Sequence, residues 1–109
     1  MKFAKFLRRF IAKPHDGFQN QTLAVAPEVS ASVHADGVAL LHIPTGKVYL
    51  CNRTASRIWD GVVKGFTAEA ICNELSRECG VGREVVEQHT FSFLSELERR
   101  RLVIRRVDA

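Results

Sequence analysis

Residues 29–51 read VSASVHADGVALLHIPTGKVYLC, and two tight-turn signals divide them into three short segments. The first segment, Val29 to His34, alternates apolar and polar residues, which is the period of a strand with one buried face. Asp36-Gly37 favours a hairpin turn that needs a positive φ. Pro44-Thr45-Gly46 favours a second turn. The stretch therefore predicts an antiparallel meander of three strands.

Helical patterns follow this meander. Asn52 or Thr54 can cap a first helix that ends near Gly65. Thr67 can cap a second helix, and apolar residues at helical spacing predict a third from about Glu84 to Arg100. Three strands need a helical layer to bury one face. The expected fold class is therefore α+β, with a three-stranded antiparallel sheet followed by a three-helix bundle.

The N-terminal region differs from this body. Residues 2–13 read KFAKFLRRFIAK, with a stripe of apolar side chains at helical spacing and basic residues largely opposite. Residues 15–28 are mostly small and polar and predict a linker. We expect a basic amphipathic extension and linker over residues 1–28 and a folded domain over residues 29–109. The extension could dock on a partner or on the domain, lie on a membrane surface, or serve as a targeting segment.

The charge distribution argues against a nucleic-acid-binding body. The chain has 109 residues and a formal net charge of +4, a length that suits one domain. Residues 1–13 carry five basic residues and no acid, and residues 99–109 carry five arginines and one aspartate. Residues 14–98 hold six basic and eleven acidic residues, so the body is acidic. A nucleic-acid-binding protein should instead carry positive charge over its body.

The sequence offers little for catalysis or for metal binding. Its three cysteines form no CxxC pair, and its four histidines show no HExxH spacing, so we expect no metal site and no cofactor. A dyad of Cys51 and His42 can be imagined on neighbouring strands, but no third group supports it. We therefore expect a non-enzymatic binding module. No apolar run is long enough to span a membrane and no secretory signal is visible, which favours the cytoplasm.

Two stretches of the chain resemble a known protein family. Residues 40–75 (LLHIPTGKVYLCNRTASRIWDGVVKGFTAEAICNEL), followed by residues 93–103 (FLSELERRRLV), resemble the PqqD family. These small peptide chaperones belong to a wider group of recognition elements for the precursors of ribosomally synthesised, modified peptides. The resemblance covers about residues 29–103 and implies three strands followed by three helices, in a winged-helix-like arrangement.

The resemblance also implies a binding mode. In the family, the leader segment of a precursor peptide adds as a fourth strand beside the third strand and lies in a groove against the third helix. The protein then presents the peptide to a modifying enzyme, such as a radical SAM maturase or a leader peptidase. Strand addition uses the backbone groups of an open sheet edge, and side-chain pockets add selectivity.

Two flanks of the third helix could line the groove. One carries Val85, His89, Ser92 and Glu96; the other carries Glu87, Phe91 and Glu98. We favour the first flank because its small and apolar positions leave room for a peptide side chain. The predicted peptide-binding residues are Val48, Tyr49, Leu50, Val85, His89 and Ser92.

Two other functions compete with peptide binding. A winged-helix transcription regulator would read DNA with the third helix, but that helix carries four glutamates. Membrane-associated scaffolding through residues 2–13 could coexist with peptide binding. The exposed third strand could also support a homodimer. One departure from the family concerns the end of the third helix, where Arg101 precedes Leu102 in place of the usual glycine, so the last turn could end differently.

Overall fold

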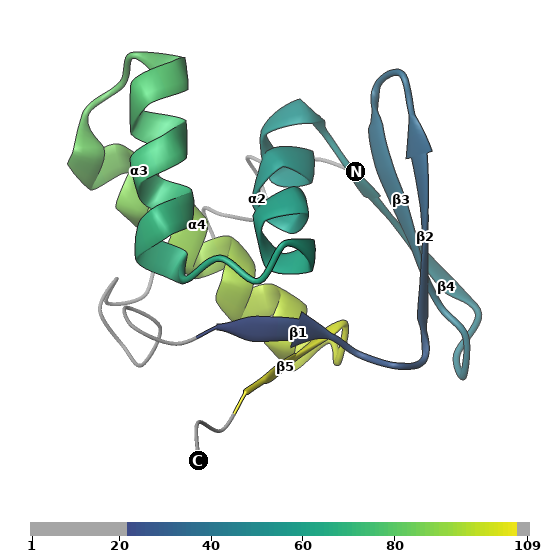
Figure 1. Cartoon of the computed structure of the whole chain (residues 1–109). Helices are drawn as coiled ribbons and strands as arrows, with labels where there is room; N and C mark the ends of the chain where they lie inside the picture. Colours follow the sequence, from purple (N-terminus) through teal and green to yellow (C-terminus); the bar gives the residue numbers. More distant parts are fainter. Residues whose placement is uncertain (1–21, 107–109) are drawn as a thin grey trace.

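The computed structural model describes residues 22–106, and the extension predicted over residues 2–13 lies outside this range. The strands are β1 (Leu23–Val25), β2 (Val29–His34), β3 (Gly37–His42), β4 (Lys47–Cys51) and β5 (Val103–Arg105). The helices of the described residues are α2 (Arg53–Val63), α3 (Ala68–Cys79) and α4 (Arg83–Arg99). This order confirms the predicted α+β class, with the helices lying beside the sheet (Figure 1).

Strands β2, β3 and β4 form the predicted antiparallel meander, with β3 in the centre. Gly37, at the first turn, has a φ of 149°, and a Cβ added there would lie 1.9 Å from the carbonyl oxygen of Cys51. The hairpin therefore requires glycine at this position. In the second pair, Leu40 lies opposite Tyr49, and Val38 lies opposite Cys51. Leu40 is fully buried, so this face of the sheet is the one that meets the helices.

The helices begin where the sequence predicts caps. The Asn52 side chain accepts a hydrogen bond from the backbone N–H of Ala55 at 2.9 Å. Thr67 does the same for Ala70 at 3.1 Å and starts α3. Such caps satisfy backbone donors that the first helical turn leaves unpaired. The core between sheet and helices includes Leu40, Ile58, Trp59, Phe93 and Leu94, all at most 3% exposed.

A second, two-stranded sheet was not predicted. Strand β1 pairs antiparallel with β5, so that Leu23 lies opposite Arg105 and Val25 lies opposite Val103. The prediction of a linker over residues 15–28 was therefore wrong for its described end, because Leu23 is only 3% exposed and belongs to the core. Each strand has three residues, too few for a period-two pattern to be recognised.

The end of α4 also differs from the expectation. Arg101 has a φ of 63° and is the one non-glycine residue with a positive φ among residues 22–106. Its N–H donates to the carbonyl of Glu98, and the N–H of Leu102 donates to the carbonyl of Leu97 at 2.9 Å. This bonding pattern is the Schellman motif, which normally has glycine at the left-handed position. The helix therefore ends in the usual way although arginine occupies that position.

Candidate functional site: the open edge of strand β4

Strand β4 lies at one edge of the meander, and its register shows which backbone groups face outward. The N–H of Ile43 donates to the carbonyl of Glu28 at 3.0 Å, which makes this opposed pair a hydrogen-bonded one. Hydrogen-bonded and non-bonded pairs alternate along an antiparallel ladder. Tyr49 therefore bonds to β3, and the N–H and C=O groups of Val48 and Leu50 point to the open edge.

The side chains of β4 alternate between the two faces of the sheet. Val48 and Leu50 lie on the face away from the helices and are 58% and 53% exposed, so they are not ordinary core residues. Tyr49 lies on the helix face, half-buried against the core. The three residues predicted on β4 thus lie on an edge strand with two exposed apolar side chains, and they do not share one face.

A contact between Tyr49 and the end of α4 forms the inner wall beside this edge. The guanidinium carbon of Arg100 lies 5.2 Å from the centroid of the Tyr49 ring, a cation–π distance. Glu96, only 1% exposed, accepts hydrogen bonds from both Arg99 and Arg100. The buried carboxylate therefore orients Arg100 toward β4. Glu96 belongs to the flank of α4 favoured from the sequence, whereas Arg100 was not predicted, because its only signal is its spacing of four residues from Glu96.

The other predicted residues of α4 lie farther from β4. His89 and Val85 precede Arg100 by 11 and 15 residues, roughly 16 and 22 Å along the helix axis. Both are exposed, and Val85 has 46% of its surface accessible. Ser92 is only 3% exposed, so the expectation of an open position there was wrong. The structure therefore does not bring these three residues together with the β4 edge at one point; a ligand would have to extend along α4 to reach them.

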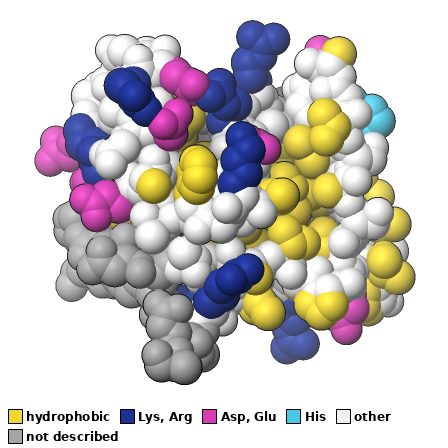
Figure 2. Space-filling model, viewed as in Figure 1, with side chains coloured by type: hydrophobic (Ala, Val, Ile, Leu, Met, Phe, Trp, Pro, Cys, Tyr) yellow, Lys and Arg dark blue, Asp and Glu magenta, His cyan; other side chains and the backbone are white. Residues whose placement is uncertain are grey.

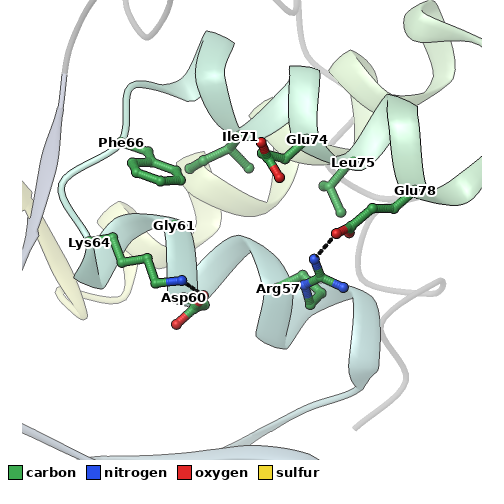
Figure 3. Close-up of a pocket in the computed structure, with 9 residues that line it drawn as sticks. All are labelled: Arg57, Asp60, Gly61, Lys64, Phe66, Ile71, Glu74, Leu75 and Glu78. Carbon is green, nitrogen blue, oxygen red and sulfur yellow. Dashed lines mark hydrogen bonds and ion pairs between the residues drawn. The ribbon is translucent and has the colours of Figure 1, made fainter.

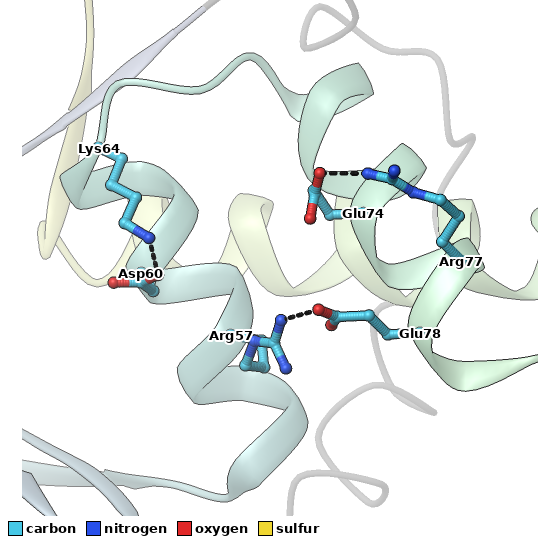
Figure 4. Close-up of polar contacts among 6 residues, drawn as sticks. All are labelled: Arg57, Asp60, Lys64, Glu74, Arg77 and Glu78. Atoms are coloured by element: carbon cyan, nitrogen blue, oxygen red, sulfur yellow. Dashed lines mark hydrogen bonds and ion pairs between the residues drawn. The ribbon is translucent and has the colours of Figure 1, made fainter.

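A small hollow between α2 and α3, of about 70 Å³, is lined by charged residues (Figure 3). Its charges are matched in pairs, as Figure 4 shows: Arg57 with Glu78, Lys64 with Asp60, and Arg77 with Glu74. Gly61 lies so close to α3 that an added Cβ would be 2.6 Å from Ile71 Cγ1. Only the Arg57–Glu78 pair joins α2 to α3, because each of the other two pairs belongs to a single helix. The residues drawn offer no unmatched charge.

The imagined Cys51–His42 dyad does not form. Cys51 lies opposite Val38, four residues along β3 from His42, which corresponds to roughly 13 Å. The His42 ring instead shares a hydrogen bond with the Thr45 hydroxyl at 2.9 Å. Burial raises the pKa of the Cys51 thiol to about 11, so it is protonated near neutral pH and a poor nucleophile.

The described residues contain no group of three or more His, Cys, Asp or Glu side chains placed to hold a metal ion. Within the same part of the chain, no helix has the length and apolar character needed to cross a membrane. The site is thus an open strand edge beside a helix end. Its backbone groups can pair with an extended peptide, and its Tyr49 and Arg100 can contact the side chains of that peptide.

The sequence profile of the family described as "Coenzyme PQQ synthesis protein D (PqqD)" matches residues 37–103, more than half of the chain. The chain belongs to the PqqD family. The match runs from the start of β3 to the start of β5 and so includes the β4 edge and α4.

Two solved structures have folds similar to that of this chain. "TbiB1 in Complex with the TbiA(beta) Leader Peptide" has a TM-score of 0.72 and 29% identity, covering 78% of this chain and 99% of that one. "Lasso peptide synthetase B1 complexed with the leader peptide" has a TM-score of 0.71 and 22% identity, covering 75% and 96%, and supports the fold alone. No curated protein sequence matches the chain significantly.

Proposed function

We propose that this chain is a non-catalytic adaptor. It binds the leader segment of a ribosomally synthesised precursor peptide by strand addition along β4 and presents that peptide to a separate modifying enzyme. The observation that carries the proposal is the edge of β4, which no strand within residues 22–106 pairs, with the backbone groups of Val48 and Leu50 directed outward beside the Tyr49–Arg100 contact. The similar protein TbiB1, which was solved in complex with a leader peptide, supports this use of the fold.

The edge and the helix have different roles in this proposal. Backbone groups of Val48 and Leu50 supply affinity that does not depend on the peptide sequence. Tyr49 and Arg100 contact side chains on the inner face of the added strand. Exposed His89 and Val85 extend the contact along α4, so they select among leaders that reach beyond the strand.

The modifying chemistry comes from a partner enzyme in this proposal. Both a radical SAM maturase and a leader peptidase are compatible with an adaptor that holds only the leader. The adaptor leaves the rest of the precursor free for either enzyme. We place this activity in the cytoplasm, where precursor peptides are made.

The proposal is tested with a proline at each edge of the same sheet. Val48→Pro removes a backbone donor that points outward from β4, whereas Ala31→Pro removes an outward donor from β2 at the opposite edge. Fluorescence polarisation with labelled leaders of precursor genes near this one measures binding. We expect wild-type dissociation constants in about the micromolar range or below, and at least about a tenfold loss for Val48→Pro alone.

Circular dichroism and thermal unfolding test whether both variants are folded before binding is compared. Equal binding by a folded Val48→Pro variant would rule out strand addition at β4. A short duplex DNA in the same assay tests the regulator alternative, whose binding would fall steeply as salt is raised. Binding of the duplex but of no leader would replace the adaptor proposal with that alternative.

A further inference from the structure

Strand β2 is the other edge of the meander, and no strand within residues 22–106 pairs with its outer side. Its sequence lacks the residues that usually protect such an edge. Natural edge strands commonly carry charged residues or proline that discourage pairing with another chain. Strand β2 reads VSASVH and has no Lys, Arg, Asp, Glu or Pro. Its Val33 is 83% exposed, more than any other large hydrophobic residue described. Such a strand is suited to pair with another strand.

The register identifies the backbone groups that β2 offers. Glu28 and Ile43 form a hydrogen-bonded pair, so Ser30 and Ser32 also bond to β3. The N–H and C=O groups of Ala31 and Val33 therefore point outward. The backbone groups of Val29 also point outward. Its N–H already donates to the carbonyl of Ala26 at 3.2 Å, so only its carbonyl can accept a hydrogen bond from another strand.

The sequence of this edge is symmetric about Ala31. Residues 29–33 read Val-Ser-Ala-Ser-Val, the same in both directions. A two-fold interface places the same surface of two identical chains against itself, so it must be self-complementary. An antiparallel pair centred on Ala31 meets this requirement, because it places each residue type opposite its own kind.

We propose that β2 pairs antiparallel with β2 of a second copy of this chain, with the two Ala31 residues opposite each other. This pairing makes four backbone hydrogen bonds. The N–H of each Ala31 donates to the carbonyl of the other, and the N–H of each Val33 donates to the carbonyl of Val29 in the second copy. The Val29 N–H groups do not take part, because they remain bonded to Ala26.

The side chains support the same register. On the face toward the helices, Val33 meets Val29 of the second copy, an apolar cross-strand pair. On the other face, Ser30 meets Ser32 of the second copy, where their hydroxyls can bond. Beyond the palindrome, Glu28 meets His34 of the second copy, so a carboxylate lies opposite an imidazole at both ends. The paired residues bring no like charges together.

An open cleft beside Val33 leaves room for this contact. It has a volume of about 450 Å³ between α2 and the β2–β3 hairpin, and its wall includes Val33, Trp59 and Val63. Figure 2 shows hydrophobic side chains gathered along this cleft. Pairing covers the rim of the cleft with Val29 of the second copy and withdraws the exposed surface of Val33 from water. The resulting sheet has six strands and leaves a β4 edge open at each end.

Sedimentation velocity of the full chain over a range of concentrations tests the proposal. We expect a reversible monomer–dimer equilibrium. Ala31→Lys places two like charges at the two-fold axis and should raise the dimer dissociation constant at least about tenfold. Ala35→Lys adds the same charge outside the paired residues and should change that constant less than about threefold. A wild-type chain that stays monomeric up to about 1 mM, or an Ala31→Lys variant that dimerises equally well, overturns the proposal.

Cross-linking tests the register directly. In a Cys79→Ser background, which removes the exposed thiol, Ala31→Cys and Ala35→Cys are compared with a short bis-maleimide. The two thiols introduced at Ala31 would lie about 5 Å apart, whereas the two introduced at Ala35 would lie roughly 26 Å apart. We expect covalent dimer only from the first variant. Equal cross-linking of both variants, or of neither, contradicts this register.

The dimer proposal and the adaptor proposal can be tested separately. Val48→Pro should reduce leader binding and leave the dimer intact, because it changes only β4. Ala31→Pro should abolish the dimer and leave leader binding intact. Loss of both properties in either folded variant would contradict the assignment of the two edges to different partners.

Discussion

The guanidinium of Arg100 lies over the ring of Tyr49, 5.2 Å from its centroid, and so joins the end of α4 to the edge strand β4. Glu96 accepts a hydrogen bond from the same arginine and is itself almost fully buried. A strand added beside β4 would lie next to this contact. Arg100 thus joins α4 to the edge strand, and in the proposed complex it would also contact the bound peptide.

Arg100→Ala tests this dual placement. We expect leader binding to weaken by about twofold to tenfold, because in the proposed complex Arg100 also contacts the peptide, and one partly solvated contact of a cation contributes about 0.5–1 kcal/mol or slightly more. Fluorescence polarisation measures the change. Arg106→Ala is the matched control, since it removes the same charge from an exposed position just after β5. Equal losses in the two variants would assign the effect to net charge and not to this contact.

Arg101→Gly should stabilise the protein. Arg101 adopts a φ of 63° at the left-handed position that ends α4, where a side chain costs energy that glycine avoids. We expect the free energy of unfolding to rise by about 1 kcal/mol. Urea unfolding followed by the fluorescence of Trp59, the single tryptophan, measures it. Arg106→Gly has no positive φ to relieve and should not stabilise; a gain there as large as in Arg101→Gly would contradict the explanation.

Gly37→Ala and Gly46→Ala should lower the free energy of unfolding by clearly different amounts. Both glycines have positive φ, but only at Gly37 would a Cβ meet a backbone atom, the carbonyl oxygen of Cys51 at 1.9 Å. We expect Gly46→Ala to cost about 1 kcal/mol, the usual penalty of the left-handed region. Gly37→Ala should cost at least about 2 kcal/mol because β3 and β4 must also shift. Similar losses in urea unfolding would show that the close approach to Cys51 is unimportant.

The raised pKa of the Cys51 thiol predicts that the protein loses stability at high pH. Burial raises its pKa from 9.0 to about 11, so the folded state favours the protonated thiol. The contribution of this group is fully present below pH 9 and is lost as pH rises through about 11. Cys51→Ala should therefore show a shallower fall in the free energy of unfolding between pH 9 and 11. Urea unfolding at several pH values measures this slope, and an unchanged slope would contradict the shift.

Alkylation with iodoacetamide provides an independent check on the same thiol. Cys79 is exposed, whereas Cys51 and Cys72 are buried. We expect mass spectrometry of the native protein at about pH 8, near the ordinary thiol pKa, to find Cys79 modified first. Modification of Cys51 as fast as Cys79 would show that this end of β4 opens readily.

The meander and the helices could be predicted because each has a local signal. Asp36-Gly37 and Pro44-Thr45-Gly46 divide the strands, and Asn52 and Thr67 cap the helices, all within a few residues. The β1–β5 pair has no such signal, because its two short strands lie at opposite ends of the described chain. Its formation depends on the burial of Leu23, which becomes visible only once the core is assembled.

The candidate site, like the fold, could be predicted only in part. The exposed edge with Val48 and Leu50 followed from strand order, since the last strand of a meander lies at its edge. The burial of Ser92 and the approach of Arg100 to Tyr49 depend on how α4 crosses the sheet, which helical periodicity does not specify. A helical pattern assigns residues to a flank but not to a depth or to a neighbour.

The pairing of β1 with β5 brings the two ends of the described chain within one hydrogen bond of each other. The N–H of Arg106 donates to the carbonyl of Thr22 at 3.1 Å. A polypeptide that enters and leaves at one point can be spliced into a surface loop of another protein without stretching either flank. The same unit could thus be carried inside a longer enzyme, or circularly permuted with new termini at an exposed turn, while both edges of its sheet stay available.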